Sequence, residues 1–452
     1  MYGQKQNKYS IMKKNLLIAI LVSISFTQIS FAQVLGLREQ ANIIDEVLDE
    51  RINNLLPNLM EKNKIDMWVI VSREYNEDPI IKTFLPSTWL SARRRTIIVF
   101  YYNPATKIYK KLAVARYKVG NTIEAAWDQT KFPNQWDQLN NIVATLKPNK
   151  IGLNYSSDFG HADGLDLTDY QELTKAVKLP QGASFVSASN LGVAWLETRT
   201  QREMEFYTQV NNITHKIIEE GFSSKVITPG ITTTDDLVWW FRQKLNNMGL
   251  DTWFHPSVEI QRNDSAIFDH LKAFTNESNN VILAGDLLHV DFGIKYLRLN
   301  SDIQEHAYVL KPNETDAPTY LKEGLKTANR LQDILTSNFK TGLTGNQILK
   351  ASLDQAKSEN IIASIYTHPI GYYGHAAGPT IGMWDMQNGV PGSGDYPMYK
   401  NTCYSIELNA SVFIKEWNKN VRFMLEQNGH FDGNSFYYID GRQTNLHLIG
   451  RH

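Results

Sequence analysis

Cysteine is nearly absent from this sequence: Cys403 is the only one among 452 residues. No disulfide can therefore form within the chain, and its fold cannot depend on covalent cross-links. Cys403 lies in an apolar, strand-like segment, where a small buried residue is a simpler interpretation than a catalytic nucleophile. Packing must hold the chain together instead, and aromatic residues, at 11% of the composition, supply ample core material.

A surplus of one charge sign is also missing. Lysine and arginine total 46, aspartate and glutamate total 47, and the two signs are mixed along the chain. Without a basic face or a long like-charged run, the sequence gives no reason to expect a nucleic-acid partner. The length, by contrast, is too great for one ordinary domain, so we expect two.

An apolar run long enough for a confident membrane span is lacking near the N-terminus. The run Leu16–Phe26 is shorter than the roughly 20 residues that a transmembrane helix needs. Two lysines precede it, and Ser30–Ala32 offers small residues for cleavage, a pattern typical of a secretory signal. We therefore expect residues 1–32 to be an extension with a signal peptide at Met12–Ala32, and the mature protein to be periplasmic or secreted. A retained anchor is the alternative; after cleavage no stable membrane span is expected.

Residues 33–196 predict an α/β domain with a mixed sheet, because short β-rich runs alternate with amphipathic segments. The expected helices cover residues 40–62 and 136–146, and the expected strands cover residues 67–71, 96–102, 112–119 and 151–153. This half contains no phosphate-binding glycine loop and no nucleophile elbow. Its local motifs therefore predict a fold but no chemistry.

Residues 197–452 form the second expected domain, where long amphipathic helices flank a strand-rich segment. Gly249 suits the C-terminal cap of one helix, and Thr344 with Gln347 forms the capping-box pattern that opens another. The expected helices lie near residues 203–220, between residues 232 and 249, near residues 318–339, and from residue 344 onward.

The segment Leu287–Leu310 carries the first sign of chemistry. Its apolar ends and central turn residues predict two antiparallel strands with a short irregular connection. Asp291 and Asp302 lie within it, and a carboxylate buried in an apolar strand is costly unless a cation or hydrogen bonds compensate it. The pair indicates a metal centre. The alternative, equally weighted on this segment alone, is one turn cap and one buried ion pair.

Three further candidate ligands follow. His375 is flanked by glycine and alanine, which lets other groups approach its ring, while Glu407 and Glu426 interrupt apolar strand-like runs. Five donors that include four carboxylates are too rich in oxygen for a structural zinc site. They suit two hard or borderline divalent ions that share carboxylates. Such ions can lower the pKa of a shared water from about 16 to about 7.

At these residues the sequence resembles the metallopeptidase family that includes aminopeptidase P, prolidase, methionine aminopeptidase and creatinase. Asp291-Phe292-Gly293 matches the family's DxG element and Ser301-Asp302-Ile303 its SD element, with the two aspartates eleven positions apart. His375, Glu407 and Glu426 match the remaining elements in the family order. The five-part pattern is specific, whereas any single element would be weak evidence.

The resemblance implies a fold and an activity. A creatinase-like α/β domain at residues 33–196 would precede an α+β pita-bread catalytic domain at residues 197–452. Two divalent ions are implied, manganese first, with cobalt or zinc as alternatives. A peptide substrate would lose its N-terminal residue to a hydroxide shared by the ions, as in an Xaa-Pro aminopeptidase. The alternatives are a prolidase-like dipeptidase, another amide hydrolase, or a catalytically silent binding protein; a homodimer is a further expectation.

Residue roles also follow from the resemblance. Asp291 and Asp302 would hold one ion, and His375 and Glu407 the other. Asp302 and Glu426 would bridge the two ions. Glu407 would also be catalytic, because it would take the proton from the attacking water.

Four more residues are candidates for catalysis or substrate binding. His270 resembles the upstream histidine that contacts substrate or shuttles a proton, with a surface-loop histidine as the alternative. His368 can replace the histidine that normally lies four residues before the metal histidine, although it lies seven before His375. Trp384 stands where a histidine usually precedes an acidic residue. Arg422 lies two residues before the position of a family arginine.

Further departures concern the strands of the two aspartates. Gln304 and Glu305 stand where the family often has threonine and arginine. His289, two residues before Asp291, should face the same side of its strand. It either fills the core, which we slightly favour, or compensates for a missing histidine. These departures bear on substrate preference rather than on metal binding.

Overall fold

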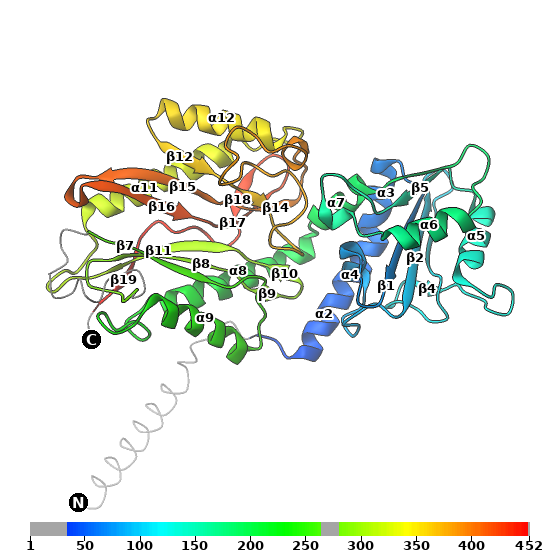
Figure 1. Cartoon of the computed structure of the whole chain (residues 1–452), viewed down its shortest axis with the longest axis horizontal. Coiled ribbons are helices and arrows are strands. Elements are labelled where there is room, and N and C mark those ends of the chain that lie inside the picture. The colour runs from blue at the N-terminus through cyan, green and yellow to red at the C-terminus, as the bar shows by residue number, and fades with distance from the viewer. Residues whose placement is uncertain (1–33, 264–279, 451–452) are drawn as a thin grey trace, which may run out of the picture. The chain divides into compact units, whose positions relative to one another are not determined.

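The computed structural model describes residues 34–263 and 280–450 (Figure 1). The expected signal peptide and His270 lie outside these described residues, so both stay predictions. Among the helices of the described residues, none is both long and apolar enough to cross a membrane.

The first sheet of the chain is mixed and six-stranded. Its strands are β1 (Met67–Arg73), β2 (Arg95–Asn103), β3 (Ile108–Ala113), β4 (Glu124–Ala125), β5 (Lys150–Leu153) and β6 (Ser184–Ser187). They lie in the order β4-β3-β2-β1-β5-β6. Because β1 pairs antiparallel with β2 and parallel with β5, the prediction of a mixed sheet is confirmed.

One predicted strand of this sheet, over residues 112–119, is displaced in the structure: β3 begins at Ile108 and ends at Ala113. The turn before it sets the shift. Asn103 Oδ1 accepts hydrogen bonds from the backbone N–H groups of Ala105 and Thr106, at 3.0 and 3.1 Å, so the chain reverses early and pairs Ile108 with Asn103. Two lysines interrupt the apolar residues of β3, so the position of this strand could not be predicted from an apolar run.

Helices cover both faces of this sheet. They are α2 (Leu37–Glu50), the π-helical turn η1 (Arg51–Leu55), α3 (Leu56–Asn63), α4 (Pro79–Phe84), α5 (Gln135–Leu146), the 3-10 turn η2 (Gly160–Ala162), α6 (Leu167–Ala176) and α7 (Ser189–Glu197). The run α2-η1-α3 contains the predicted helix at residues 40–62. Residues of α3, α4 and α7 share one core with Trp68 and Phe100, and residues of α5 and α6 share the other with Val69 and Val99.

The later part of the chain builds three larger sheets and a small hairpin. The strands are β7 (Ser257–Gln261), β8 (Leu287–Phe292), β9 (Lys295–Tyr296), β10 (Leu299–Asn300), β11 (Ile303–Val309), β12 (Ile362–Ile365), β13 (His368–Pro369), β14 (Thr402–Ser405), β15 (Leu408–Ile414), β16 (Lys419–Leu425), β17 (Asn428–Phe431), β18 (Phe436–Tyr438) and β19 (His447–Ile449). Their orders are β19-β11-β8-β7, β12-β15-β16, β13-β14-β17-β18 and β10-β9. The antiparallel pair β8–β11 confirms the predicted strands of Leu287–Leu310.

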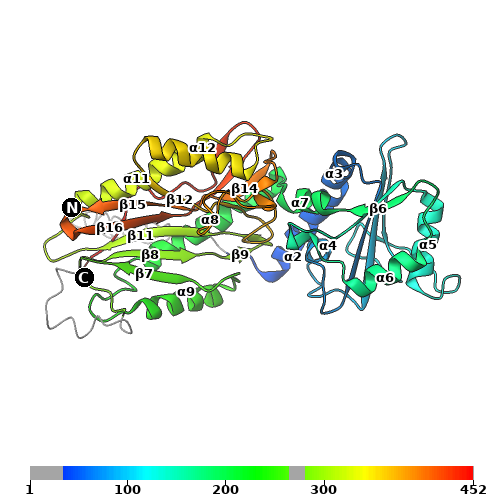
Figure 2. The same cartoon turned by 45° about the horizontal axis from the view of Figure 1, so that its top comes forward.

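The helices of this part begin and end near the predicted signals. They are α8 (Gln201–Gly221), α9 (Thr234–Met248), α11 (Thr319–Ser337) and α12 (Gly345–Ser358), with short 3-10 turns η4 (Ser393–Asp395) and η5 (Lys415–Trp417). Thr344 and Gln347 form the predicted capping box, and Gly249 has the left-handed φ of 68° that its cap requires. Figures 1 and 2 show α11 beside β15 and β16, and α9 beside β7.

Strands change sheets at three short junctions, and these junctions position the site. Asp302 lies between β10 and β11, Glu407 between β14 and β15, and Glu426 between β16 and β17. The backbone of Glu426 also exchanges two hydrogen bonds with that of Gln304, at 3.0 and 3.2 Å, which joins β11 to the end of β16. Polar side chains at these junctions therefore meet between sheets whose other residues are apolar.

Candidate metal centre

The donor side chains meet in three overlapping groups. In each group, one ligand atom from every residue lies within 4.8 Å of the others. Five of the six residues come from strands or sheet junctions, which fix their backbones. The groups are Asp291 with Asp302 and Glu426, His368 with Glu407 and Glu426, and Asp302 with His368 and His375.

Hydrogen bonds hold the two glutamates in place. Gln304 Nε2 donates to Glu407 Oε1 at 2.5 Å and to Glu426 Oε2 at 2.8 Å. Ser405 Oγ donates to Glu426 Oε1 at 2.6 Å. The junction of Asp302 is fixed as well, because its backbone N–H donates to Asn428 Oδ1 at 3.1 Å and its carbonyl accepts from Asn428 Nδ2 at 2.9 Å. The carboxylates are thus preorganised rather than free to turn toward solvent.

The site is a cluster of buried acidic side chains, and this sets its electrostatics. Burial raises the pKa of Asp291, Asp302 and Glu407 well above the usual range, and the nearby charge of Glu426 raises each pKa further. Burial lowers the pKa of His368, but the carboxylates of Glu426 and Glu407 outweigh it and the net shift is upward. Four carboxyl groups against two imidazoles leave acidic groups in excess in a buried place.

Several ligand atoms have no hydrogen-bond partner within the described residues. They are Asp291 Oδ1, Asp302 Oδ1 and His368 Nε2, each buried. His368 Nε2 lies 3.4 Å from Glu426 Oε1, 3.6 Å from Asp302 Oδ2 and 3.9 Å from Glu407 Oε2, so its free nitrogen faces the carboxylates. Nδ1 of the same ring lies 2.9 Å from the carbonyl of Pro369, which leaves Nε2 as the nitrogen that can take a ligand. Buried oxygen and nitrogen atoms that have no hydrogen-bond partner can serve as ligands of divalent cations.

The two candidate histidines have different places from those expected. The structure places His368, and not His375, against Glu407 and Glu426. The physical reason is the ladder: β13 pairs His368 with Ser405, two residues before Glu407. His375 lies in the irregular chain after β13, is exposed, and joins only the group with Asp302 and His368. The expected pairing of His375 with Glu407 is therefore not what the structure contains.

The other candidates for substrate binding are outside this cluster. Trp384 is 78% exposed, and no contact joins it to the donor groups in the described part of the chain. Arg422 is exposed on β16, where its side chain lies 3.8 Å from Glu259 in a loose ion pair. His375 is closer to a substrate-facing role than either, because its ring lies 5.0 Å from that of Trp253 and 4.7 Å from that of His368.

Sequence reasoning missed the residues that support the donors. Ser405 and Asn428 escaped notice because a lone serine or asparagine beside an apolar strand carries no local signal. Gln304 and His289 were visible as departures, but their contact was not. His289 is buried, its Nε2 lies 2.9 Å from Gln304 Oε1, and burial lowers its pKa well below the usual value, so the ring is neutral.

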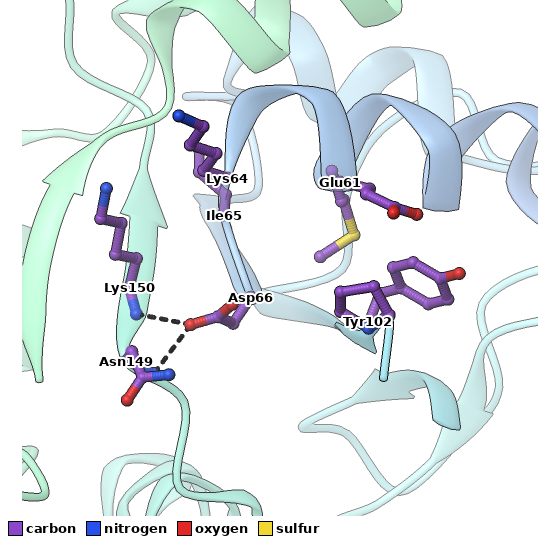
Figure 3. Close-up of a pocket in the computed structure, with 9 residues that line it drawn as sticks. Glu61, Lys64, Ile65, Asp66, Tyr102, Asn149 and Lys150 are labelled. Atoms are coloured by element: carbon purple, nitrogen blue, oxygen red, sulfur yellow. Dashed lines mark hydrogen bonds between the residues drawn. The ribbon is translucent and has the colours of Figure 1, made fainter. Parts of the chain in front are cut away.

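Pockets on the first sheet do not coincide with the donor cluster. One, of about 330 Å³, is lined by residues including Lys64, Asp66, Tyr102 and Lys150 (Figure 3). Asp66 Oδ2 already accepts hydrogen bonds from the backbone N–H groups of Asn149 and Lys150, both at 2.9 Å. None of the residues that line this pocket belongs to the three donor groups, and those groups are the better candidate site.

The comparison with protein families decides the assignment. Residues 205–427 match the family described as metallopeptidase family M24. These residues therefore form a domain of that family. The M24 match contains every residue of the three donor groups, from Asp291 to Glu426. Comparison with curated proteins finds no match.

Solved structures share the fold of the M24 domain and of the region before it. An X-Pro aminopeptidase from Thermotoga maritima MSB8 has a TM-score of 0.60 and 17% identity, and the alignment covers 86% of this chain and 99% of that one. An Xaa-Pro dipeptidase from Bacillus anthracis has values of 0.54 and 17%, with 91% and 100% covered. A dipeptidase from Pyrococcus horikoshii OT3 has values of 0.56 and 16%, with 88% and 99% covered.

These likenesses concern the fold, because the identities are low. They extend over most of this chain, so the predicted fold class is confirmed: a creatinase-like α/β region followed by a pita-bread catalytic domain. The exact boundary at residues 196 and 197 stays a prediction; it falls before the last residue of α7, just ahead of the short connection to α8.

Proposed function

We propose that this M24 protein is a dinuclear metal-dependent aminopeptidase that removes the residue before proline at a peptide N-terminus. The observation that carries the proposal is the overlap of the donor groups. Asp291, Asp302 and Glu426 form one group, and His368, Glu407 and Glu426 form another, so Glu426 belongs to both. A carboxylate that belongs to both groups suits a pair of adjacent divalent ions.

We divide the candidate ligands between two ions according to these groups. Asp291 would hold the first ion and His368 with Glu407 the second, while Asp302 and Glu426 would contact both. Four carboxylates and one imidazole favour manganese, with cobalt or zinc as the alternatives, because the set is rich in hard oxygen donors. When bound, such ions supply a nucleophilic water near neutral pH and polarise a substrate carbonyl.

The residues of the chain would do the remaining work. Glu407, with Oε1 fixed by Gln304, keeps Oε2 toward the site and is placed to accept the proton of the attacking water. His375 is exposed beside Trp253, whose indole N–H donates to the carbonyl of Ser301 at 3.0 Å. This fixed indole gives the peptide an apolar wall, and the imidazole a place to contact its backbone.

The preference for proline is supported by the names of the structural neighbours and by nothing in the site itself. One is an X-Pro aminopeptidase and one an Xaa-Pro dipeptidase, so a prolidase-like dipeptidase is the second candidate. The two activities differ in substrate length. An Xaa-Pro-Yaa tripeptide tests the aminopeptidase, and an Xaa-Pro dipeptide tests the dipeptidase.

The experiment uses the purified protein with manganese, cobalt or zinc, before and after chelation. We expect cleavage of the tripeptide, its loss on chelation, and its return with added metal. Asp302→Asn keeps the shape of the side chain but removes the charge that the two ions would share. Cleavage should therefore fall by about 10³-fold or more, which corresponds to about 4 kcal/mol of barrier. Metal uptake without cleavage of either peptide would point to another amide substrate. No metal uptake would leave a catalytically silent binding protein.

Two further proposals concern the whole protein. We propose that it is exported, because residues 12–32 carry the pattern of a signal peptide; N-terminal sequencing of protein from the cell envelope or medium should then begin near Gln33. We also propose a homodimer, an expectation from the family resemblance. Sedimentation of the mature protein at a mass near that of one chain would contradict it.

A further inference from the structure

Gln304 forms hydrogen bonds with both candidate glutamate ligands of the second ion. Its amide nitrogen donates one hydrogen bond to Glu407 Oε1 at 2.5 Å and one to Glu426 Oε2 at 2.8 Å. A side-chain amide has two N–H donors, so both are used here. One planar group therefore sets the spacing between two carboxylates that lie on different sheet junctions.

The bonds of Gln304 leave the other oxygens for the site. Glu407 Oε2 and Glu426 Oε1 are the atoms that face His368 Nε2, at 3.9 and 3.4 Å. Gln304 thus occupies the outer oxygen of each carboxylate and turns the inner oxygen toward the imidazole. If the amide were absent, Glu407 would lose the hydrogen bond that holds its Oε1, whereas Glu426 would keep that from Ser405.

The orientation of the amide is settled by chemistry rather than by shape. Two carboxylates need donors, so the nitrogen must face them and Gln304 Oε1 must face away. Gln304 Oε1 lies 2.9 Å from His289 Nε2, which must then carry the proton and donate. His289 is 4% exposed, and its Nδ1 has no hydrogen-bond partner within the described residues. Among the described residues, the side chain to which the His289 ring is hydrogen-bonded is therefore that of Gln304.

We propose that Gln304, oriented by His289, is a positioning residue that holds Glu407 and Glu426 in the geometry needed to load the second divalent ion. This inference rests on the proposed dinuclear site. It assigns a role to Gln304, which is not one of the five candidate metal ligands. Partners of metal ligands of this kind contribute about 10- to 100-fold to metal affinity. The first ion depends on Asp291, Asp302 and Glu426, and Glu426 retains Ser405, so it should be affected less.

The test is metal binding by Gln304→Met, which keeps the length of the side chain and removes both donors. Calorimetric titration with Mn²⁺ and the visible spectrum with Co²⁺ count the ions and report their geometry without any assay of cleavage. For wild type we expect two ions. For Gln304→Met we expect one ion with nearly unchanged affinity, a second weakened by about 10- to 100-fold, and loss of the Co²⁺ bands that arise from the second ion.

The matched control is Gln443→Met. Gln443 is also buried and bonded to β11, where its side chain exchanges two hydrogen bonds with the backbone of His306, at 2.7 and 2.8 Å. Within the described residues, its side chain has no hydrogen bond to a candidate metal ligand. It should keep both ions, although its stability falls. Equal loss of the second ion in Gln443→Met would show a general effect of a damaged strand and overturn the proposal.

His289→Leu supplies a second variant if Gln304→Met does not fold. It leaves both donors of Gln304 but frees the amide to turn, so the second ion should weaken in the same direction by a smaller factor. Two ions of wild-type affinity in both variants would overturn the role of Gln304 while leaving the proposed function standing. No ion bound by wild type would instead overturn the proposed function.

Discussion

The two faces of β11 hold buried carboxylates in opposite ways. On one, the ligand face, Gln304 contacts Glu407 and Glu426, and among the described residues the basic side chain that faces these carboxylates is His368. On the other, the histidine face, Glu305 Oε2 lies 2.6 Å from His447 Nε2 and Glu305 Oε1 lies 3.7 Å from His215 Nε2. Successive residues of a strand point to opposite sides, so these environments are separated by one backbone.

The difference appears in the pKa values. Burial raises the pKa of Glu305, but the hydrogen bond from His447 and the charge of His215 outweigh it, and the net shift is downward. For Glu407 burial and the charge of Glu426 act together, and the pKa is raised well above its usual range. The histidine face has its own counter-charges, whereas the ligand face has too few. Burial of acid alone therefore does not mark a metal site; the shortage of internal cations does.

The largest effect should come from replacing the two histidines near the ligand face one at a time. His368→Ala removes the nitrogen that faces Glu426 and Glu407, so the second ion should be lost and cleavage should fall by about 10³-fold or more. His375→Ala should keep two ions and change mainly KM, because the ring is exposed and outside the Glu407 group. Metal content by elemental analysis, with kinetics on the tripeptide, separates the two variants.

The opposite pattern would restore the assignment made from sequence. If His375→Ala lost an ion and His368→Ala kept both, the metal histidine would be His375. The chain would then have to rearrange after β13 when metal binds, which a structure with Mn²⁺ would reveal.

The histidines also show what sequence could and could not supply. Asp291 and Asp302 are eleven residues apart in one hairpin, so their meeting follows from local pairing and could be predicted. His368 reaches its place through the pairing of β13 with β14, which joins it to Ser405, 37 positions later. Nothing near His368 in the sequence encodes that distant partner. Small neighbours made His375 look accessible instead, and accessibility is not the same as proximity to carboxylates.

Helix ends could be predicted from the sequence, whereas the site could be predicted only in part. The reason is the distance along the sequence between the residues that interact. The capping box at Thr344 and the left-handed Gly249 depend on residues within one turn, so the local sequence suffices. The contact of Gln304 with Glu407 spans 103 positions. It depends on the register of β11 against β8 and on three sheet junctions, none of which has a signature in residue type.

The next effect concerns the histidine face and the stability of the fold. Glu305→Gln keeps the shape but removes the charge that His447 and His215 face, so the free energy of unfolding should fall by about 2 kcal/mol. Urea denaturation of the metal-free protein measures it. Glu359→Gln is the control, because Glu359 pairs with Arg330 at the surface and its loss should change the stability very little.

The matched substitution on the ligand face should have the opposite sign. Asp302 has a raised pKa, so in the metal-free protein its contribution to stability falls as the pH rises above 3.8, the ordinary value. Asp302→Asn removes that charge and should raise the free energy of unfolding at pH 7 by about 1 kcal/mol. The gain should vanish near pH 4 and reverse when Mn²⁺ stabilises the wild type alone. Destabilisation at pH 7 without metal would erase the distinction between the two faces.

The smallest effect is the pH dependence of the histidine face. His215 places Nδ1 2.8 Å from Asp440 Oδ2 and Nε2 2.8 Å from Gln427 Oε1, so both ring nitrogens face acceptors and the charged ring satisfies both. Burial lowers the pKa of His215, but the hydrogen bond that its ring donates to Asp440 and the charge of Glu305 outweigh it, and the net shift is upward.

A raised histidine pKa stabilises the fold fully below 6.5, the unfolded value, and this stability is lost as the pH rises through the folded pKa. Glu305, with its lowered pKa, stabilises the fold above 4.5 and loses that stability as the pH falls. The network should therefore contribute most between these values. Urea denaturation of metal-free wild type and His215→Gln should differ by about 1 kcal/mol at pH 5.5 and by less at pH 8.5. A difference that grows with pH would mean that the neutral ring is the one the fold prefers.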